Sequence, residues 1–164
     1  NLDCAERIGI EINPSARSVA KQSGLSVFES LDSVEPHSID VTVSNHALEH
    51  VLSPYECLCG IRQVLKPRGR LILCVPIDDW RRQKEADPDD VNHHLYTWTP
   101  LLLGNLLLET GFQLESLRIY SHAWPEKQWQ KLDQHLPVWL FDLVCRMTAW
   151  QYKRRQILAI AVAP

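Results

Sequence analysis

The chain has 164 residues, of which 45% are hydrophobic and 23% charged, and its formal net charge is −3. This length and composition predict a single globular domain over 1–164. The acidic balance argues against nucleic acid as a partner, since nucleic-acid binding usually requires a basic surface. We also expect no stable membrane span, because no apolar run approaches the roughly 20 residues that a bilayer requires.

The cysteines are odd in number and form no C-x-x-C pair. This pattern favours reduced thiols in a cytoplasmic protein over a disulfide framework or a zinc knuckle. The five are Cys4, Cys57, Cys59, Cys74 and Cys145.

The first predicted strand covers 7–12, where isoleucines alternate with other residues. Asn13 and Pro14 predict the cap and first position of a helix. That helix is expected to stop at Gly24, a residue typical of helix C-termini. A weaker strand is predicted over 25–31.

The next segment alternates strand and helix. A strand is predicted over 39–45, and Ser53 with Pro54 predicts the start of a helix. A turn follows at 66–69. The continuous apolar run 71–75 predicts a strand that is covered on both faces.

The segment 77–98 is long and highly charged, and we expect it to be a variable loop with a functional role. Thr99 predicts the cap of another helix, which ends at Gly111. A strand is expected over 112–120.

A helical insertion is predicted over 121–154, with a break at Pro137, before a last apolar strand over 156–162. Basic residues follow the apolar helix, so a membrane-surface helix is one alternative. We favour a helix that packs on the sheet and partly covers the pocket. The alternation of strands and helices predicts an α/β domain with a mostly parallel sheet and an antiparallel last strand.

Glu11 lies near the carboxyl end of the first predicted strand, where ligands bind in doubly wound folds. An acid at this place commonly accepts hydrogen bonds from ribose hydroxyls, and the alternative is a solvated strand-end glutamate. A glycine-rich turn normally lies about 20 residues before such an acid. Only ten residues precede Glu11. We therefore expect the first strand and its glycine-rich loop to lie upstream of Asn1.

Residues 46–50, HALEH, match the H-x-x-E-H pattern of inverted zinc peptidases. His46 and His50 are four residues apart, which fits one helical face, with the glutamate as general base. However, a strand directly precedes the motif and a new helix cap follows it. His93 and Glu85 are candidate third ligands, but the sequence singles out neither. We predict that no metal binds here.

A nicotinamide-dependent short-chain dehydrogenase also carries an acid after its second strand. It would need a Tyr-x-x-x-Lys pair, and none of the four tyrosines has a lysine four residues later. The sequence therefore excludes a short-chain dehydrogenase of this type.

Several motifs together resemble the class I S-adenosylmethionine-dependent methyltransferases, in the group that includes small-molecule methylases. The run RIGIEINPSA resembles the second strand and its ribose-binding acid. The later matches, in chain order, are SNHALEHV, RQVLKPRG, RLILCVP and HHLYTWTPLLLGNLLLETGF. Two departures are Arg68, where the family often has glycine, and the ending Phe28-Glu29-Ser30 of the third strand.

The resemblance implies a Rossmann-like doubly wound fold and transfer of a methyl group from S-adenosylmethionine to a small-molecule acceptor. His50 would be structural, and a catalytic base, where one is needed, would be His93 or His94. Implied donor contacts are Glu11, Ile12, Glu29, Ser30, Asn45 and His46. Implied substrate contacts are Trp80, Arg81 and Tyr96.

A non-catalytic methyltransferase-like binding module is the alternative function. Without its first strand the sheet would lack a central strand, and a parallel sheet with such a gap should be unstable alone. We therefore expect either an upstream segment or a homodimer that covers the gap. A 164-residue chain that is monomeric, fully folded and tight for S-adenosylmethionine would contradict this expectation.

Overall fold

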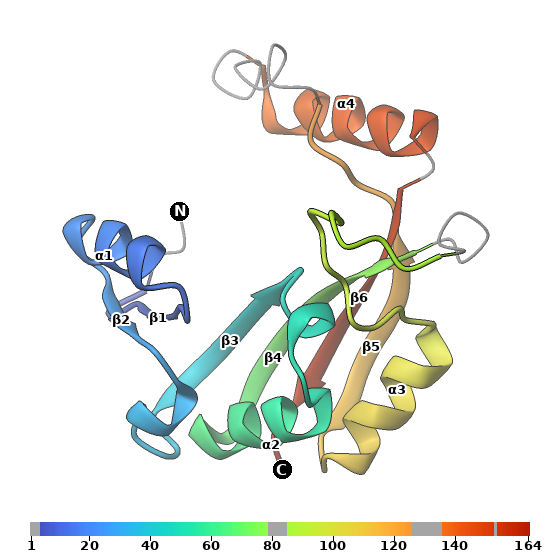
Figure 1. Cartoon of the computed structure of the whole chain (residues 1–164). Coiled ribbons are helices and arrows are strands. Elements are labelled where there is room, and N and C mark those ends of the chain that lie inside the picture. The colour runs from blue at the N-terminus through green and yellow to red at the C-terminus, as the bar shows by residue number, and fades with distance from the viewer. Residues whose placement is uncertain (1–3, 79–84, 126–135, 153) are drawn as a thin grey trace.

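A computed structural model describes residues 4–78, 85–125, 136–152 and 154–164. Figure 1 shows the course of the chain through its helices and strands. The elements follow in the order β1 (Ile8–Ile10), α1 (Pro14–Gln22), β2 (Ser26–Phe28), the 3-10 turn η1 (Leu31–Ser33), β3 (Ile39–Asn45), the 3-10 turn η2 (Leu48–His50), α2 (Pro54–Val64), β4 (Leu65–Ile77), α3 (Pro100–Glu109), β5 (Gln113–Tyr120), α4 (Val138–Gln151) and β6 (Arg155–Val162).

The strands form two hydrogen-bonded sheets. One contains β1 and β2 in parallel, and the other has the order β3-β4-β6-β5. Strands β3 and β4 are parallel, whereas β6 runs antiparallel to both of its neighbours. The α/β fold with an antiparallel last strand is therefore confirmed. In the described part of the chain, β1 and β3 each keep one edge without a strand partner, which is where we expected a central strand to be lacking.

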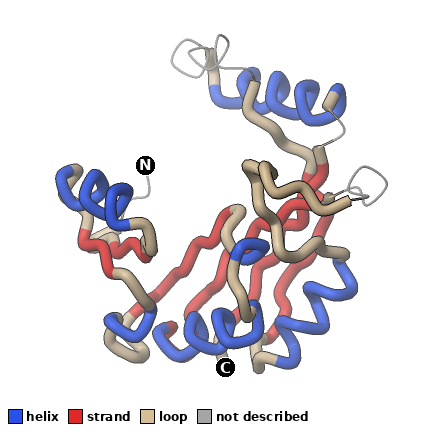
Figure 2. The backbone as a smooth tube through the Cα atoms, in the orientation of Figure 1, coloured by secondary structure: helices blue, strands red, loops and turns tan. Residues whose placement is uncertain are grey.

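The main core lies between the four-stranded sheet and helices α2 and α3, which cover one of its faces (Figures 1 and 2). Leu71, Leu73 and Val75 of β4 alternate toward this side, and each is 0% exposed. Burial of one such leucine stabilises the fold by about 1.5–3 kcal/mol. The helices contribute Leu58, Ile61, Leu103 and Leu107.

The opposite face of this sheet is less well covered. Val41 and Val43 of β3 are 50% and 53% exposed. Ile72 on the neighbouring strand is half-buried. The predicted cover on both faces of the run 71–75 is therefore incomplete, because the described helices pack on one face only.

The turn predicted at 66–69 is built into β4 as an irregularity. The register with β3 shifts there, and Arg68 adopts a φ of 63°. A Cβ atom on Gly69 would lie 2.8 Å from the carbonyl oxygen of Lys66, so the chain needs glycine at this position. The left-handed backbone conformation thus falls on Arg68, whereas the steric need for glycine falls on the next residue, Gly69.

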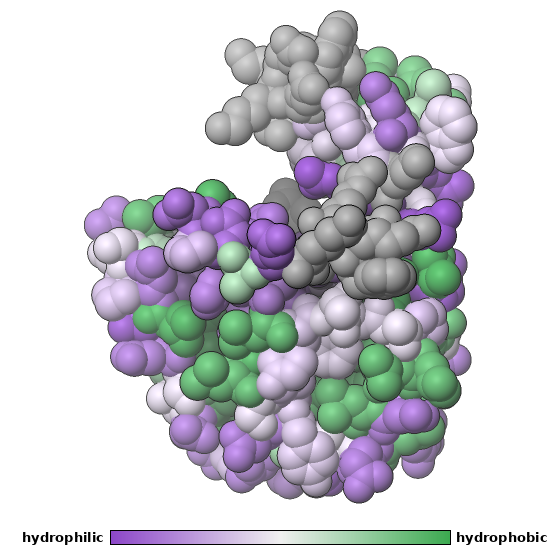
Figure 3. All heavy atoms as spheres, turned by 45° about the vertical axis from the view of Figure 1, so that its right-hand side comes forward, coloured by the Kyte–Doolittle hydropathy of each residue, from purple (hydrophilic) through white to green (hydrophobic). Residues whose placement is uncertain are grey.

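Helix α4 begins after Pro137, which confirms the predicted break, while 126–135 lie outside the described residues. The expected packing of this helix on the sheet is wrong. Trp139, Met147 and Trp150 are 69%, 63% and 83% exposed, and Figure 3 shows hydrophobic surface at the top of the molecule, where α4 lies. The helix instead contacts the preceding loop, whose Ala123 N–H donates to the Cys145 carbonyl of α4 at 3.2 Å. An apolar stripe reveals helical periodicity but not what covers it.

Candidate functional site

The carboxyl end of β3 turns sharply at His46, which has a φ of 51°. Its backbone N–H donates to the Cys74 carbonyl at 2.9 Å, so the strand pairing continues up to the turn. The single 3-10 turn η2 follows, and α2 begins soon after it with a new cap at Ser53. HALEH is therefore one turn at a strand end, as predicted, and lacks the long helix of a zinc peptidase.

Glu49 is fully buried, and neither of its carboxylate oxygens has a hydrogen-bond partner among the described residues. Its main chain is well anchored, because the N–H groups of Leu95 and Tyr96 donate to its carbonyl at 2.9 and 3.3 Å. The Tyr96 hydroxyl donates to the Leu52 carbonyl at 2.8 Å. The loop before α3 is thus held over η2 and covers the buried carboxylate of Glu49.

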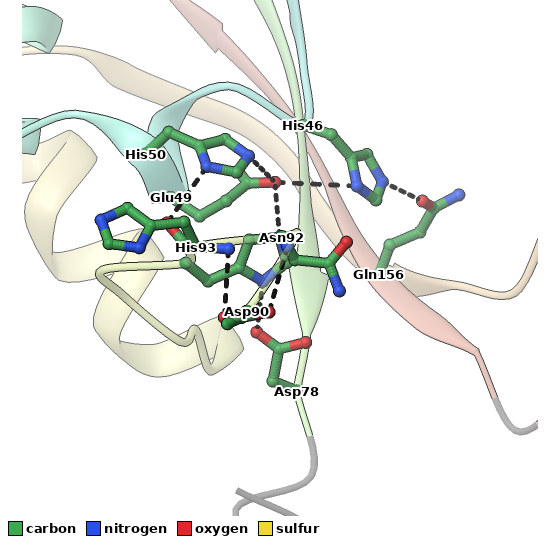
Figure 4. Close-up of polar contacts among 9 residues, drawn as sticks. His46, Glu49, His50, Asp78, Asp90, Asn92, His93 and Gln156 are labelled. Carbon is green, nitrogen blue, oxygen red and sulfur yellow. Dashed lines mark hydrogen bonds and ion pairs between the residues drawn. The ribbon is translucent and has the colours of Figure 1, made fainter. Parts of the chain in front are cut away.

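Three histidines surround one oxygen of this carboxylate. The Glu49 Oε1 atom lies 3.7 Å from Nδ1 of His46 and 3.9 Å from Nε2 of His50. Nε2 of His94 lies 4.0 Å from the same oxygen. Figure 4 shows the rings of His46 and His50 on either side of Glu49. These separations are too long for hydrogen bonds.

The other ring nitrogens of two of these histidines have oxygen partners. Nδ1 of His94 lies 2.8 Å from Oδ2 of Asp78, at the end of β4. Nδ1 of His50 lies 3.4 Å from the carbonyl oxygen of His93. The rings of His50 and His94 meet edge to face, with centroids 4.9 Å apart. These contacts fix the direction in which each ring points.

His46 is oriented from the last strand. Its Nε2 lies 2.7 Å from Oε1 of Gln156 in β6. The amide nitrogen of Gln156 donates to the His122 carbonyl at 3.4 Å, which supports the orientation of the amide. Gln156 was not among the predicted site residues, and its signal in the sequence is a polar residue at the start of the otherwise apolar run 156–162.

Glu49, His50 and His94 each offer one ligand atom, and these atoms all lie within 4.8 Å of one another. The prediction of no metal rested on the strand before the motif and the helix cap after it, and on the lack of an identifiable third ligand. The fold brings His94 to the motif, rather than His93 or Glu85. Only the main chain of His93 takes part in the contacts described here, through its carbonyl and through its N–H, which donates to Asp90 at 3.1 Å.

Cys74 lies close to this cluster on β4. Burial, and secondarily the charge of Glu49, raises the pKa of its thiol. The thiol therefore stays protonated at neutral pH, and a protonated thiol is a poor nucleophile and metal ligand.

A second group of predicted residues lies at the carboxyl ends of β1 and β2. Oε1 of Glu11 accepts a hydrogen bond from the Asn13 N–H at 2.8 Å, and its other oxygen has no partner in the described parts of the chain. Arg17 donates to the Glu11 carbonyl at 2.6 Å and pairs with Oε2 of Glu29 at 3.1 Å. Arginine therefore ties the two strand ends together and neutralises Glu29.

The other residues predicted to contact S-adenosylmethionine differ in how free their side chains are to bind it. The Ser30 hydroxyl accepts from the Asp32 N–H at 3.2 Å and donates to the Asp32 carboxylate, so it caps η1. Ile12 is 78% exposed and Asn45 is also exposed. Of the predicted substrate contacts, Trp80 and Arg81 lie outside the described residues. Tyr96 lies in the loop before α3 and bonds to the backbone of Glu49 and Leu52.

A surface hollow of about 840 Å³ lies at the other end of the strands, where β4 begins and β6 ends. Its lining is rich in charged groups, including Lys66, Arg68, Arg70 and Glu115. It does not include the carboxyl ends of the parallel strands, where ligands bind in open α/β sheets. We therefore place the candidate site at His46 and Glu49 rather than in this hollow.

Comparison with known proteins supplies the family context. Residues 2–73 match the model of a methyltransferase domain, and no curated protein sequence matches significantly. An S-adenosylmethionine-dependent methyltransferase from Methanosarcina mazei matches with a TM-score of 0.64 at 17% identity, covering 94% of this chain and 80% of that one.

Two further solved structures have the same fold. One is the complex of the Haloferax volcanii Trm112 methyltransferase activator with its partner, with a TM-score of 0.65, 16% identity and coverage of 97% and 72%. The other is the [4+2]-cyclase SpnF, with a TM-score of 0.62, 16% identity and coverage of 99% and 68%. Identities this low show the fold alone, and the cyclase illustrates that one fold hosts different reactions. Residues 2–73 thus match a methyltransferase domain, and the chain has the fold of an S-adenosylmethionine-dependent methyltransferase.

Proposed function

We propose that the protein transfers a methyl group from S-adenosylmethionine to a small-molecule acceptor. The observation that carries the proposal is the placement of polar side chains that can bind the donor at the ends of two strands. Glu11 lies beyond β1, and Asn45 with His46 lies at the end of β3. In doubly wound sheets, these are the places that meet a bound nucleotide.

The residues at the end of β1 suit the ribose and adenine of the donor. Glu11 keeps one carboxylate oxygen without a partner in the described chain, and a carboxylate can accept from both vicinal hydroxyls. The exposed side chain of Ile12 offers an apolar wall beside it. Glu29 and Ser30 suit this role less well, because Arg17 and Asp32 already engage them.

When bound, the donor supplies a methyl group on a cationic sulfur: an acceptor lone pair forms the new bond to carbon while the carbon–sulfur pair returns to sulfur. The protein then has mainly to position the acceptor and exclude water. Tyr96, together with Trp80 and Arg81, is proposed to contact the acceptor. In the metal-free protein, His94 is the better oriented of the two base candidates, because Asp78 holds its ring.

A non-catalytic binding module remains the second candidate. Its support is the interruption between β1 and β3, since a site that spans two separate sheets is not rigidly held. We also predict that two copies of the chain can associate and cover this gap. Sedimentation measurements with and without S-adenosylhomocysteine test this prediction.

Calorimetric titration of the chain with S-adenosylhomocysteine tests the proposal. We expect measurable binding that Glu11→Gln weakens about 10-fold or more, since a hydrogen bond to a charged group contributes about 1.5–3 kcal/mol. Glu6→Gln makes the same charge change at a nearby exposed position and should leave the affinity unchanged. Absence of binding, or equal losses in both variants, would contradict the proposed donor site. Binding without turnover across a panel of acceptors would favour the module.

A further inference from the structure

The buried carboxylate of Glu49 faces three imidazole nitrogens and has no hydrogen bond of its own in the described chain. A buried charge of this kind is costly unless it is paired or coordinates a metal. We propose that Glu49, His46, His50 and His94 bind one divalent transition-metal ion of the Zn²⁺ type.

The hydrogen bonds behind the rings support this assignment. The outer nitrogens of His94 and His50 face the Asp78 carboxylate and the His93 carbonyl, both of which only accept. The outer nitrogen of His46 faces the amide oxygen of Gln156. Each neutral ring therefore carries its proton on the outside and presents a lone pair to Glu49 Oε1. Lone pairs that converge without protons between them favour a bound cation.

Protonated histidines explain the cluster less well. An imidazolium paired with a carboxylate makes a charge-assisted hydrogen bond of about 2.7–2.9 Å. The three observed separations, 3.7, 3.9 and 4.0 Å, are all about 1 Å longer. Ligands held about 2.0–2.2 Å from one tetrahedral ion lie roughly 3.4 Å apart. The three nitrogens are within a few tenths of an ångström of this separation from Glu49 Oε1, and the histidine rings would have to turn closer to one another around the ion.

The donor set also indicates the kind of metal. Imidazole nitrogen suits Zn²⁺, Fe²⁺, Co²⁺ or Ni²⁺, whereas Mg²⁺ and Ca²⁺ prefer oxygen ligands. The carboxylate of Asp78 behind His94 and the carbonyl behind His50 are the outer contacts that usually orient metal-ligating histidines. Since Glu49 is fully buried, it would act as a ligand and not as the general base of a peptidase.

The site has an exposed side. The side chains of His46 and His50 are both 42% exposed, and that of His94 is 17% exposed. A further ligand from solution can therefore reach the ion. Metal ligation also uses Nε2 of His94, which excludes the role of this atom as a base in methyl transfer.

The test uses the tag-free chain, stripped with a chelator and equilibrated separately with Zn²⁺, Co²⁺ and Mg²⁺. We expect about one Zn²⁺ or Co²⁺ per chain after gel filtration and no retained Mg²⁺. His50→Ala and His94→Ala should each weaken Zn²⁺ binding by more than tenfold. Asp78→Asn, which changes only an outer contact, should weaken it about 10–100-fold. His122→Ala removes a histidine outside the cluster and should bind as the wild type does.

Circular dichroism of each variant separates loss of a ligand from loss of the fold, and the absorption spectrum of bound Co²⁺ reports its ligand set. Substoichiometric Zn²⁺, or Zn²⁺ retained by a folded His50→Ala, His94→Ala double variant, would overturn the proposal. S-adenosylhomocysteine binding is measured separately on the metal-stripped chain, so that failure of the metal site does not decide the proposed methyl-donor site.

Discussion

Nε2 of His94 lies 4.0 Å from Oε1 of Glu49, although a helix, a long strand and a charged loop separate the two residues in the chain. This approach depends on two anchors: Asp78 holds the histidine ring, and the Leu95 N–H binds the Glu49 carbonyl. The buried carboxylate and the loop histidine therefore form one structural unit, whose stability should respond to charge and to metal.

Glu49→Gln should stabilise the metal-free protein. The substitution keeps the shape of the side chain, removes a buried charge and supplies an N–H₂ group that can donate to the facing histidines. We expect the free energy of unfolding to rise by about 1–3 kcal/mol in urea titrations with chelator present. Glu85→Gln, at an exposed position, should change little.

Added Zn²⁺ should make the wild type more stable than Glu49→Gln. A ligand at 100 times its dissociation constant stabilises the folded state by about 2.7 kcal/mol, and the wild type would gain more of this than Glu49→Gln. A Glu49→Gln protein that is less stable than wild type in chelator would show that the carboxylate has a favourable partner other than a metal.

Arg17→Met should loosen the two strand ends that Arg17 joins. Loss of its hydrogen bond to the Glu11 carbonyl should lower stability by about 1 kcal/mol and weaken S-adenosylhomocysteine binding, because Arg17 holds the ends of β1 and β2 together. Lys21→Met, at an exposed position in the same helix, is the matched control. Equal behaviour of the two variants in thermal melts and titrations would rule out a positioning role for Arg17.

Gly69→Ala should be strongly destabilising for a steric reason. The new Cβ atom would lie 2.8 Å from the Lys66 carbonyl oxygen and 3.2 Å from that of Ile39, both of which belong to the backbone. We expect a loss of about 1–3 kcal/mol in urea titrations. At Gly9 the nearest atoms would lie 3.6 Å away, so Gly9→Ala should be tolerated. A tolerated Gly69→Ala would mean that the irregularity in β4 can relax.

Alkaline pH should destabilise the protein partly through Cys57, because burial raises the pKa of its thiol. Above the unfolded-state pKa of about 8.5, the folded state keeps a proton that the unfolded state loses. Stability therefore falls as the pH rises from that value through the folded-state pKa. Cys57→Ala should fall less steeply in urea midpoints measured between neutral and alkaline pH, and parallel curves for the two proteins would contradict this cause.

Local rules in the sequence determined most of the elements. Asn13, Ser53 and Thr99 cap the helices that follow them, with side-chain oxygens accepting backbone N–H groups as predicted. The apolar runs 71–75 and 156–162 placed β4 and β6, and the motif order indicated the methyltransferase fold. These signals are local because capping and periodicity involve residues within a few positions of one another.

Only the tertiary structure decided which polar side chains meet. His94, Asp78 and Gln156 reach HALEH through loop docking and strand pairing, which no spacing rule in one sequence encodes. It likewise decided that α4 leaves Trp139 and Trp150 exposed, since an apolar stripe does not specify its partner. The sequence by itself determined most of the elements and the type of fold, whereas long-range packing decided that Glu49 is buried at the centre of three histidines.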